Sequence, residues 1–252
     1  MSKFMSKSIM NTTLNYSPNF YVKKRKVKEI KFIIFHYTGM KKQNQAITRL
    51  TDTKSKVSSH YLIKNNGEIL TLVPDLYVAW HAGVSSWKKY KSINKYSIGI
   101  EISNPGHEYF YKNFSKKQIK SILKLSTYLR KKYKIKSNFI LGHSDIAPDR
   151  KKDPGEKFPW KYLSKNKIGH WHNLNEKKLF KKRNQIVDKL EKNKFIKNLY
   201  KLGYPKNILF NKYKYSKLLT TAFQRRFRQE LVNGIIDQEC LFISNYLAKN
   251  MK

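Results

Sequence analysis

A short, almost continuous apolar run at residues 30–37 limits the fold of this chain more than any other segment. Ile30–Tyr37 combines isoleucine with aromatic side chains and is interrupted only by Lys31 and His36. Runs of this length and composition are typical of strands that are buried in a sheet. The sequence therefore predicts a buried strand that carries a histidine close to its end.

Four other segments predict further strands. His60–Ile63 and Glu68–Val73 are separated by Asn66-Gly67, a strong signal for a hairpin turn. In Ser97–Ile102, isoleucine alternates with smaller or polar residues, as expected for a strand with two different faces. Phe139–His143 is the last predicted strand.

A helix is predicted after Ser115, because Ser115 and Gln118 have the spacing of a capping box. Its apolar stripe consists of Ile119, Ile122, Leu123 and Leu129. Strands and helices mixed in this way predict an α/β fold in which a mixed central β-sheet is flanked by helices.

Two predicted strands carry a histidine at or next to their end, and a carboxylate follows the second. His36 is the last but one residue of the first strand, His143 ends the last strand, and Asp153 lies in the proline- and glycine-containing loop after it. A lone histidine at a strand end is usually structural. Two histidines and an aspartate at one sheet edge, however, match the three protein ligands that catalytic zinc sites use.

Seven segments in this order resemble a known family. They are SPNF (17–20), FHYTGM (35–40), VSSHYLI (57–63), NGEILTLVP (66–74), AWHAGVSSW (79–87), SIGIEISNPG (97–106) and GHSDIAPDRKKDPGEKFPW (142–160). The chain resembles the bacterial zinc-dependent N-acetylmuramoyl-L-alanine amidases of type 2, which share their fold with peptidoglycan recognition proteins. Its two-part plan is most similar to that of outer-membrane amidases acting on intact and anhydro-muropeptides.

The resemblance implies one zinc ion per chain, held by His36, His143 and Asp153. It implies hydrolysis of the amide bond between the lactyl group of (anhydro-)N-acetylmuramic acid and L-alanine of the peptide stem. Glu101 matches the family's general base and Lys151 the cation that stabilises the oxyanion.

The same resemblance predicts residues that contact the substrate. They are Tyr37, Thr38, Trp80 and His81. For Trp80, packing in the core is an equally good interpretation. His60 lies inside a predicted strand and is expected to be structural.

The net charge allows an interpretation that competes with an amidase. The chain has 54 lysines and arginines and 16 acidic residues, which give a formal net charge of +38. Nucleic-acid-binding proteins are often this basic. The lysines are spread along the whole chain, however, and no nucleic-acid motif accompanies them. A non-catalytic peptidoglycan recognition module is the other alternative, but such modules usually lack a metal ligand.

The C-terminal part resembles a small three-helix peptidoglycan-binding domain. We predict a catalytic domain at 15–165, a linker at 166–178 and a helical domain at 179–252 that binds peptidoglycan or insoluble cell wall. A plain helical bundle is the alternative interpretation. His170 and His172 of the linker are expected to be surface residues.

Apolar stripes and stop signals divide this part into helices. Gly203 is expected to end the first helix, Asn233-Gly234 forms a turn, and Asp237 caps the last helix. The stripes are Phe195, Leu199 and Leu202, then Leu218, Leu219, Ala222, Phe223 and Phe227, then Leu241, Ile243 and Leu247.

The N-terminal segment at 1–20 lacks the apolar stretch of a secretory signal, and it has no cysteine for a lipid anchor. No stretch of the chain is long and apolar enough for a membrane span. The expected location is therefore the cytoplasm, with a periplasmic or envelope-associated location as the alternative.

Overall fold

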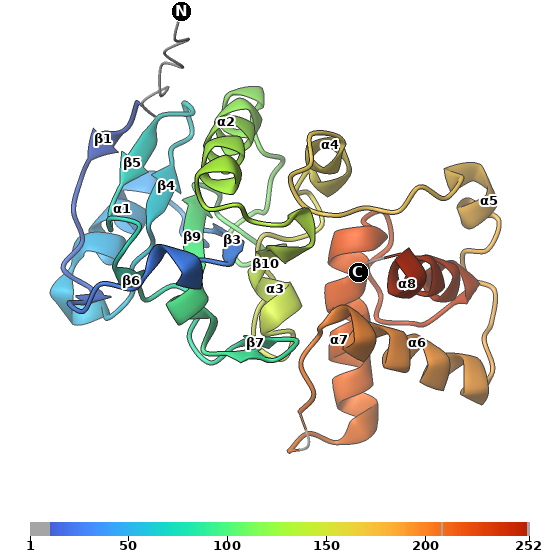
Figure 1. The fold of residues 1–252 in the computed structure, drawn as a ribbon. Helices are drawn as coiled ribbons and strands as arrows, with labels where there is room; N and C mark the ends of the chain where they lie inside the picture. The colour runs from blue at the N-terminus through green and yellow to red at the C-terminus, as the bar shows by residue number, and fades with distance from the viewer. Residues whose placement is uncertain (1–10, 208, 251–252) are drawn as a thin grey trace, which may run out of the picture.

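A six-stranded mixed sheet forms the centre of the larger part of the molecule (Figure 1). The computed structural model describes residues 11–207 and 209–250. The first half of the N-terminal segment discussed above therefore lies outside the described residues. The strands follow the order β1 (Thr13–Leu14), β5 (Ile69–Thr71), β4 (Tyr61–Ile63), β9 (Ser97–Ile102), β3 (Phe32–Tyr37) and β10 (Ile140–Gly142).

The predicted strands are confirmed: β9 has the predicted bounds, and the other four are shorter. β3 lies between β9 and β10 and is parallel to both. β4 and β5 form the predicted antiparallel hairpin, and Gly67 in its turn has a φ of +85°. One boundary was wrong: β10 ends at Gly142, and His143 begins the short helix α3 (His143–Ile146). His143 therefore lies in the first turn of a helix, directly after the strand.

Both faces of the sheet are covered, which is why β3 is apolar along most of its length. Ile33 and Phe35 belong to one core, together with Ile98 and Ile100 of β9. That core is closed by α2 (Lys116–Lys132). The alternate residues of β3 face the other way, and Phe32 and Ile34 belong to a second core.

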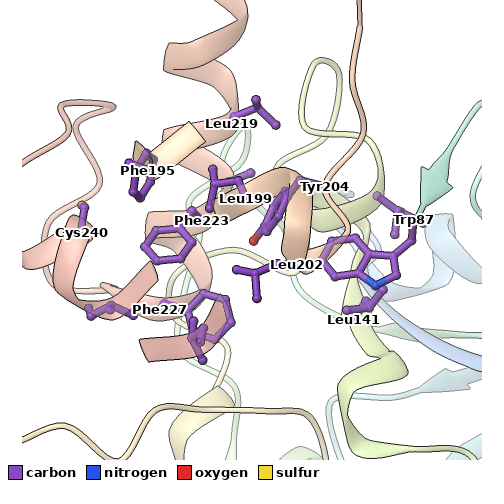
Figure 2. Close-up of a cluster of buried hydrophobic side chains, with 14 of the residues drawn as sticks. Trp87, Leu141, Phe195, Leu199, Leu202, Tyr204, Leu219, Phe223, Phe227 and Cys240 are labelled. Carbon is purple, nitrogen blue, oxygen red and sulfur yellow. The ribbon is translucent and has the colours of Figure 1, made fainter. Parts of the chain in front are cut away.

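The second core is shared with the C-terminal helices, as Figure 2 shows around Trp87 and Leu141. These helices are α5 (Glu176–Phe180), α6 (Lys189–Leu202), α7 (Lys212–Phe227) and α8 (Gln238–Asn250). Figure 1 shows them beside the part of the molecule that carries β7, β10 and α3. The strand β7 is Ser86–Trp87, and it pairs with β8 (Tyr90–Lys91).

The remaining elements are short. They are α1 (Gln43–Thr51), α4 (Trp160–Lys165), the paired strands β2 (Phe20–Tyr21) and β6 (Val78–Ala79), and 3-10 turns at Val27–Glu29, Thr53–Ser55, Ile93–Tyr96 and Ser137–Phe139. Within residues 11–207 and 209–250, no helix combines the length and apolarity that crossing a bilayer requires.

Local signals for the helices are confirmed. The backbone N–H of Gln118 donates to Ser115 Oγ (3.2 Å), and that of Ser115 donates to Gln118 Oε1 (3.0 Å). Gly203 ends α6 with a φ of +130°. Asp237 Oδ1 accepts a hydrogen bond from the N–H of Cys240 (2.9 Å) at the start of α8.

The predicted apolar stripes also face inwards. The C-terminal stripe residues are buried except Leu218, which is partly buried. In α2, Ile122 and Leu129 are buried, and Leu125 joins them although it was not in the predicted stripe.

Residues 166–178 are more buried than a linker requires. Ile168 belongs to the first core, and His172 is only 5% exposed. The prediction that His172 lies on the surface was therefore wrong. The ring of His172 stacks on Trp171, and Trp171 packs against Phe227 of α7. The domain boundaries stay a prediction, because a common core runs across them.

Candidate metal centre and catalytic cleft

Parallel pairing brings the two predicted histidine ligands together. Phe35 pairs with Gly142 across β3 and β10, so His36 and His143 are the residues that directly follow this pair. The N–H of Ser144 donates to the carbonyl oxygen of Asp153 (2.9 Å) and holds the third residue beside them.

The three side chains place one atom each at the corners of a nearly equilateral triangle. His36 Nδ1 lies 3.0 Å from His143 Nδ1 and 2.9 Å from Asp153 Oδ2, and His143 Nδ1 lies 3.0 Å from the same oxygen. All three side chains are buried. Tetrahedral zinc with bonds of about 2.0–2.2 Å needs ligand atoms somewhat more than 3 Å apart, so the triangle fits a metal after a small expansion.

The hydrogen bonds behind His36 show which of its nitrogens faces the triangle. Ser97 Oγ donates its only hydrogen to the carbonyl oxygen of Ile93 (2.7 Å), so Ser97 Oγ accepts from His81 Nε2 (3.0 Å). The other nitrogen of neutral His81 then accepts from His36 Nε2 (3.0 Å). His36 Nδ1 is left with its lone pair directed at Asp153 and His143.

His143 is fixed in the same way. Its Nε2 lies 3.1 Å from the carbonyl oxygen of Ala82, which can only accept a hydrogen bond. Nε2 is therefore the nitrogen that donates, and Nδ1 is the one available as a ligand. Two imidazole lone pairs and a carboxylate oxygen meet at about 3 Å with no hydrogen between them, an arrangement that a cation stabilises.

Ionisation of these groups agrees with a metal site. Burial, and next the neighbouring His143, lowers the pKa of His36 to about 4, so its ring is neutral near pH 7. Burial alone would raise the pKa of Asp153, but His143 and His36 hold it well below its ordinary value. A carboxylate and neutral imidazoles are the ligand forms that zinc binds.

The alternation in β9 has a function on each face. Ile98, Ile100 and Ile102 face the core under α2, while Gly99 and Glu101 face the metal site. A Cβ atom on Gly99 would overlap the ring of His81, so glycine there leaves room for the histidine that orients His36.

Glu101 is the register partner of His36, and both side chains therefore emerge on the same face of the sheet. Its Oε2 is buried and has no hydrogen-bond partner among the described residues. Burial, and next the negative charge of Asp153, raises the pKa of Glu101 well above its ordinary value, and Lys151 opposes this shift.

A cleft of about 720 Å³ contains every site residue that the sequence predicted. Its lining includes the three candidate ligands, Glu101, Lys151, Tyr37, Thr38, Trp80 and His81. The cleft is lined by five cationic side chains (Lys41, Arg49, Arg150, Lys151 and Lys152) and three acidic ones (Glu101, Glu108 and Asp153). The cleft therefore favours a substrate that carries negative charge.

The predicted substrate-contacting residues differ in how many hydrogen bonds their side chains already make within the protein. Tyr37 pairs with His107 Nδ1 (2.9 Å), and Thr38 donates to the carbonyl oxygen of Asn104 (3.1 Å). Trp80 is partly buried and its Nε1 has no partner among the described residues. Both nitrogens of His81 already bond to His36 and Ser97. The geometry thus favours a positioning role for His81.

His60 is structural, as predicted. Its Nδ1 accepts a hydrogen bond from the N–H of Gly99 (3.0 Å), and its Nε2 lies 2.9 Å from the buried guanidinium of Arg25. Burial, and next the charge of Arg25, lowers the pKa of His60 to about 3.

Sequence reasoning missed two groups beside the cleft. Arg150 donates to the carbonyl oxygens of Ala82 and Val84 and fixes the loop that also bonds His143. His107 links Tyr37 to Glu156, with its Nε2 3.0 Å from a Glu156 oxygen. The position of Arg150 in the DRKKD segment was the only signal for the first, and the second had none.

Comparisons with known proteins show the family of this chain. The N-acetylmuramoyl-L-alanine amidase family (Amidase_2) matches residues 26–156, slightly more than half of the chain. The N-acetylmuramoyl-L-alanine amidase AmiD of Escherichia coli K12 is 32% identical over 232 residues, which cover 87% of this chain and 83% of AmiD.

Solved structures extend the similarity to the whole fold. AmiD in complex with anhydro-N-acetylmuramic acid-L-Ala-D-gamma-Glu-L-Lys superposes with a TM-score of 0.77 over 88% of this chain and 90% of AmiD, at 32% identity. AmpDh3 of Pseudomonas aeruginosa in complex with anhydromuramic pentapeptide gives 0.77 at 27% identity over 100% of this chain and 99% of AmpDh3. The mixed sheet and the helical C-terminal part are therefore those of known type-2 amidases, and this chain belongs to the N-acetylmuramoyl-L-alanine amidase family.

Proposed function

We propose that this protein is a zinc-dependent amidase that hydrolyses the bond between the lactyl group of (anhydro-)N-acetylmuramic acid and L-alanine of the peptide stem. One observation carries the proposal: lone pairs of His36 and His143 and a carboxylate oxygen of Asp153 converge in a buried triangle. An unpaired carboxylate, Glu101, lies on the same face of the sheet.

The ligand set supports zinc over magnesium and calcium. Two imidazoles and one carboxylate match catalytic zinc sites, whereas magnesium and calcium prefer oxygen ligands alone. When bound, zinc polarises the scissile carbonyl group and makes water more acidic. His36, His143 and Asp153, which all line the cleft, would hold it.

Glu101 is proposed to move the proton. A general base works best when its pKa lies near the working pH, and burial raises the pKa of Glu101 in that direction. Water adds to the lactyl carbonyl carbon while Glu101 takes its proton. The C–N bond then breaks, and Glu101 returns the proton to the departing alanine nitrogen. The products are a free lactyl carboxylate and a peptide with a free amino group.

Lys151 is proposed to stabilise the negative charge that develops on the carbonyl oxygen. It lies on the cleft wall two residues before Asp153. Tyr37, Thr38 and Trp80 line the same wall and are proposed to contact the peptide stem and the sugar. The anhydro-muropeptides named in the AmiD and AmpDh3 complexes support this substrate class.

Removal and return of the metal test this proposal. The purified protein should contain one zinc ion per chain and release peptides that begin with L-alanine from muropeptides. A chelator should abolish release, and zinc should restore it. Full activity of metal-free protein would exclude the mechanism. Binding of muropeptides without any release would instead support the non-catalytic recognition module.

The C-terminal helical part is proposed to bind insoluble cell wall, an expectation that rests on its resemblance to peptidoglycan-binding domains. Because the net charge of +38 alone attracts anionic polymers, cosedimentation must be repeated at high salt, where exposed charges are screened. Binding that persists at high salt supports a specific site, and its complete loss refutes one.

A further inference from the structure

Residues 143–153, the ligand loop, begin with helix α3 and carry the candidate ligands His143 and Asp153. Within this loop, the acidic side chain of Asp145 is buried although it is not one of the candidate ligands. It is only 1% exposed and lies two residues after His143. Its Oδ2 accepts the backbone N–H of Gly142 (2.8 Å). A buried carboxylate needs several donors, because an unpaired buried charge is strongly unfavourable.

The other donors to Asp145 come from the C-terminal helical part. Arg226 of α7 forms an ion pair with Asp145 Oδ2, and the hydroxyl of Tyr204 donates to Asp145 Oδ1 (2.8 Å). Arg226 and Tyr204 are each only 3% exposed. Both lie beyond residues 26–156, the part that matches the amidase family.

Arg226 holds both sides of the point where β10 becomes α3. One of its nitrogens bonds Asp145 in α3, and the other donates to the carbonyl oxygen of Ile140 in β10 (3.1 Å). Its guanidinium group lies 4.2 Å from the ring centre of Trp160, a cation–π distance. Gly142 and His143 therefore lie between two residues, Ile140 and Asp145, that Arg226 holds in place.

The same point controls the position of the third ligand. A Cβ on Gly142 would lie only 2.6 Å from Pro154 Cδ, so the backbone at Gly142 packs directly on the residue after Asp153. The N–H of Ser144 bonds the carbonyl oxygen of Asp153. A shift of the β10–α3 junction would therefore move His143 and Asp153 together.

Tyr204 is fixed by the core that both parts share. Figure 2 shows it between Leu199 and Trp87, and its ring centre lies 5.0 Å from that of Trp87. The hydroxyl group consequently reaches Asp145 from a rigid support.

We propose that Arg226 and Tyr204 are positioning residues for the metal centre, acting through Asp145. The C-terminal helices then have a second role, since they hold two of the three metal ligands in their binding geometry. This inference rests on the proposed metal site.

The test compares substitutions of similarly buried residues, in pairs, in the full-length protein. Tyr204→Phe removes the hydroxyl group that bonds Asp145. Tyr215→Phe is its control, because Tyr215 is also 3% exposed and its hydroxyl donates to the carbonyl oxygen of Pro205 (2.8 Å), within the C-terminal part. Arg226→Met is paired with Arg228→Met, since buried Arg228 forms its ion pair with Asp237 near α8.

Zinc affinity, measured by competition with a chromogenic chelator, is the first readout. Loss of a group that orients metal ligands typically costs about 10- to 100-fold in affinity. We expect a loss of about tenfold for Tyr204→Phe and a larger one for Arg226→Met, with partial recovery in Arg226→Lys. Tyr215→Phe and Arg228→Met should stay within about twofold of the parent. Equal losses in variants and controls would overturn the proposal.

Hydrogen exchange of the metal-free protein is the second readout, and it does not depend on zinc. The amides of Gly142 and Ser144 should exchange faster in Tyr204→Phe than in Tyr215→Phe. Unchanged exchange at these amides would refute the positioning role even if Arg226→Met fails to fold. Faster exchange in Tyr204→Phe, combined with a parent protein that binds no zinc, would refute the proposed function while leaving the structural coupling in place.

Discussion

At the scale of single residues, the site is determined by hydrogen bonds that fix lone pairs. His36 and His143 each use Nε2 to bond the protein, so each presents Nδ1 to the cation site. The donor and acceptor roles along the hydrogen-bonded series Ser97–His81–His36 follow from the single hydrogen of Ser97 Oγ. Ligand geometry is thus set before any metal binds, which reduces the cost of binding.

Glu101→Gln should retain zinc and lose most turnover, because it removes the base and leaves the three ligands unchanged. Loss of a general base typically lowers kcat by about 10²–10⁴-fold. Zinc content and single-turnover rates measure the two effects separately. Near-normal kcat in this variant would show that another group takes the proton.

His81→Ala should weaken zinc binding by about 10- to 100-fold, because His36 loses the partner that fixes its tautomer. His81→Asn places an amide oxygen near the position of Nδ1 and should recover part of the affinity. A direct contact with substrate predicts a different result, a raised KM with normal zinc affinity. Chelator competition and steady-state kinetics on the same samples distinguish the two roles.

At the scale of elements, the junction between β10 and α3 is closely packed and fixed by hydrogen bonds on both sides. Gly142 has an ordinary φ of −91°, so the lack of a side chain reflects space and not backbone strain. The space is taken by Pro154 and Trp160.

Gly142→Ala should therefore destabilise the protein by about 1–3 kcal/mol, as overpacked cores do, and should also weaken zinc binding. Ser115→Ala is a suitable control, since loss of an N-cap costs about 1 kcal/mol at a helix remote from the ligand loop. Urea unfolding gives the stability and chelator competition the affinity. An alanine at 142 that changes neither quantity would show that Pro154 moves aside freely.

Local signals predicted much of this organisation. The apolar run at 30–37, the Asn66-Gly67 turn and the Ser115–Gln118 box act over a few residues, and each forms the expected structure. The candidate ligands were also found from sequence, because strand ends and a following loop are local features. The start of α3 was not predicted. Its N-terminus is capped by the side chain of Asp145, which accepts the N–H of Gly142, directly after an apolar run that predicts a strand.

Long-range partners could not be predicted. Asp145 and Arg226 are 81 residues apart, and nothing near either one indicates the other. In a chain with 54 basic residues, a buried arginine cannot be distinguished from the many exposed ones. The burial of His172 depends in the same way on α7, which follows it by forty residues.

At the scale of the whole molecule, the C-terminal helices complete the second core of the sheet. Trp87, Leu141 and Ile146 lie in one cluster with Leu199, Leu202 and Phe227. Removal of the helices would expose this surface to water, at a cost of about 25 cal/mol for each Å² of apolar area.

The predicted catalytic domain at 15–165 and linker at 166–178 imply that a truncation after Asn175 would leave a folded, active amidase. The shared core and the Asp145–Arg226 pair predict the reverse: residues 1–175 should be less stable than the full chain and should bind zinc more weakly. Thermal unfolding and chelator competition test this expectation. A truncated protein that unfolds cooperatively with full zinc affinity and activity would show that the catalytic part is independent.

The most direct test of the central claim is mass spectrometry of anhydro-N-acetylmuramic acid-L-Ala-D-gamma-Glu-L-Lys after incubation with the zinc-loaded protein. The account predicts two products, free anhydro-N-acetylmuramic acid and a tripeptide with a free L-alanine amino group, and no cleavage by the Glu101→Gln protein. Intact substrate, or cleavage at any other bond, would contradict it.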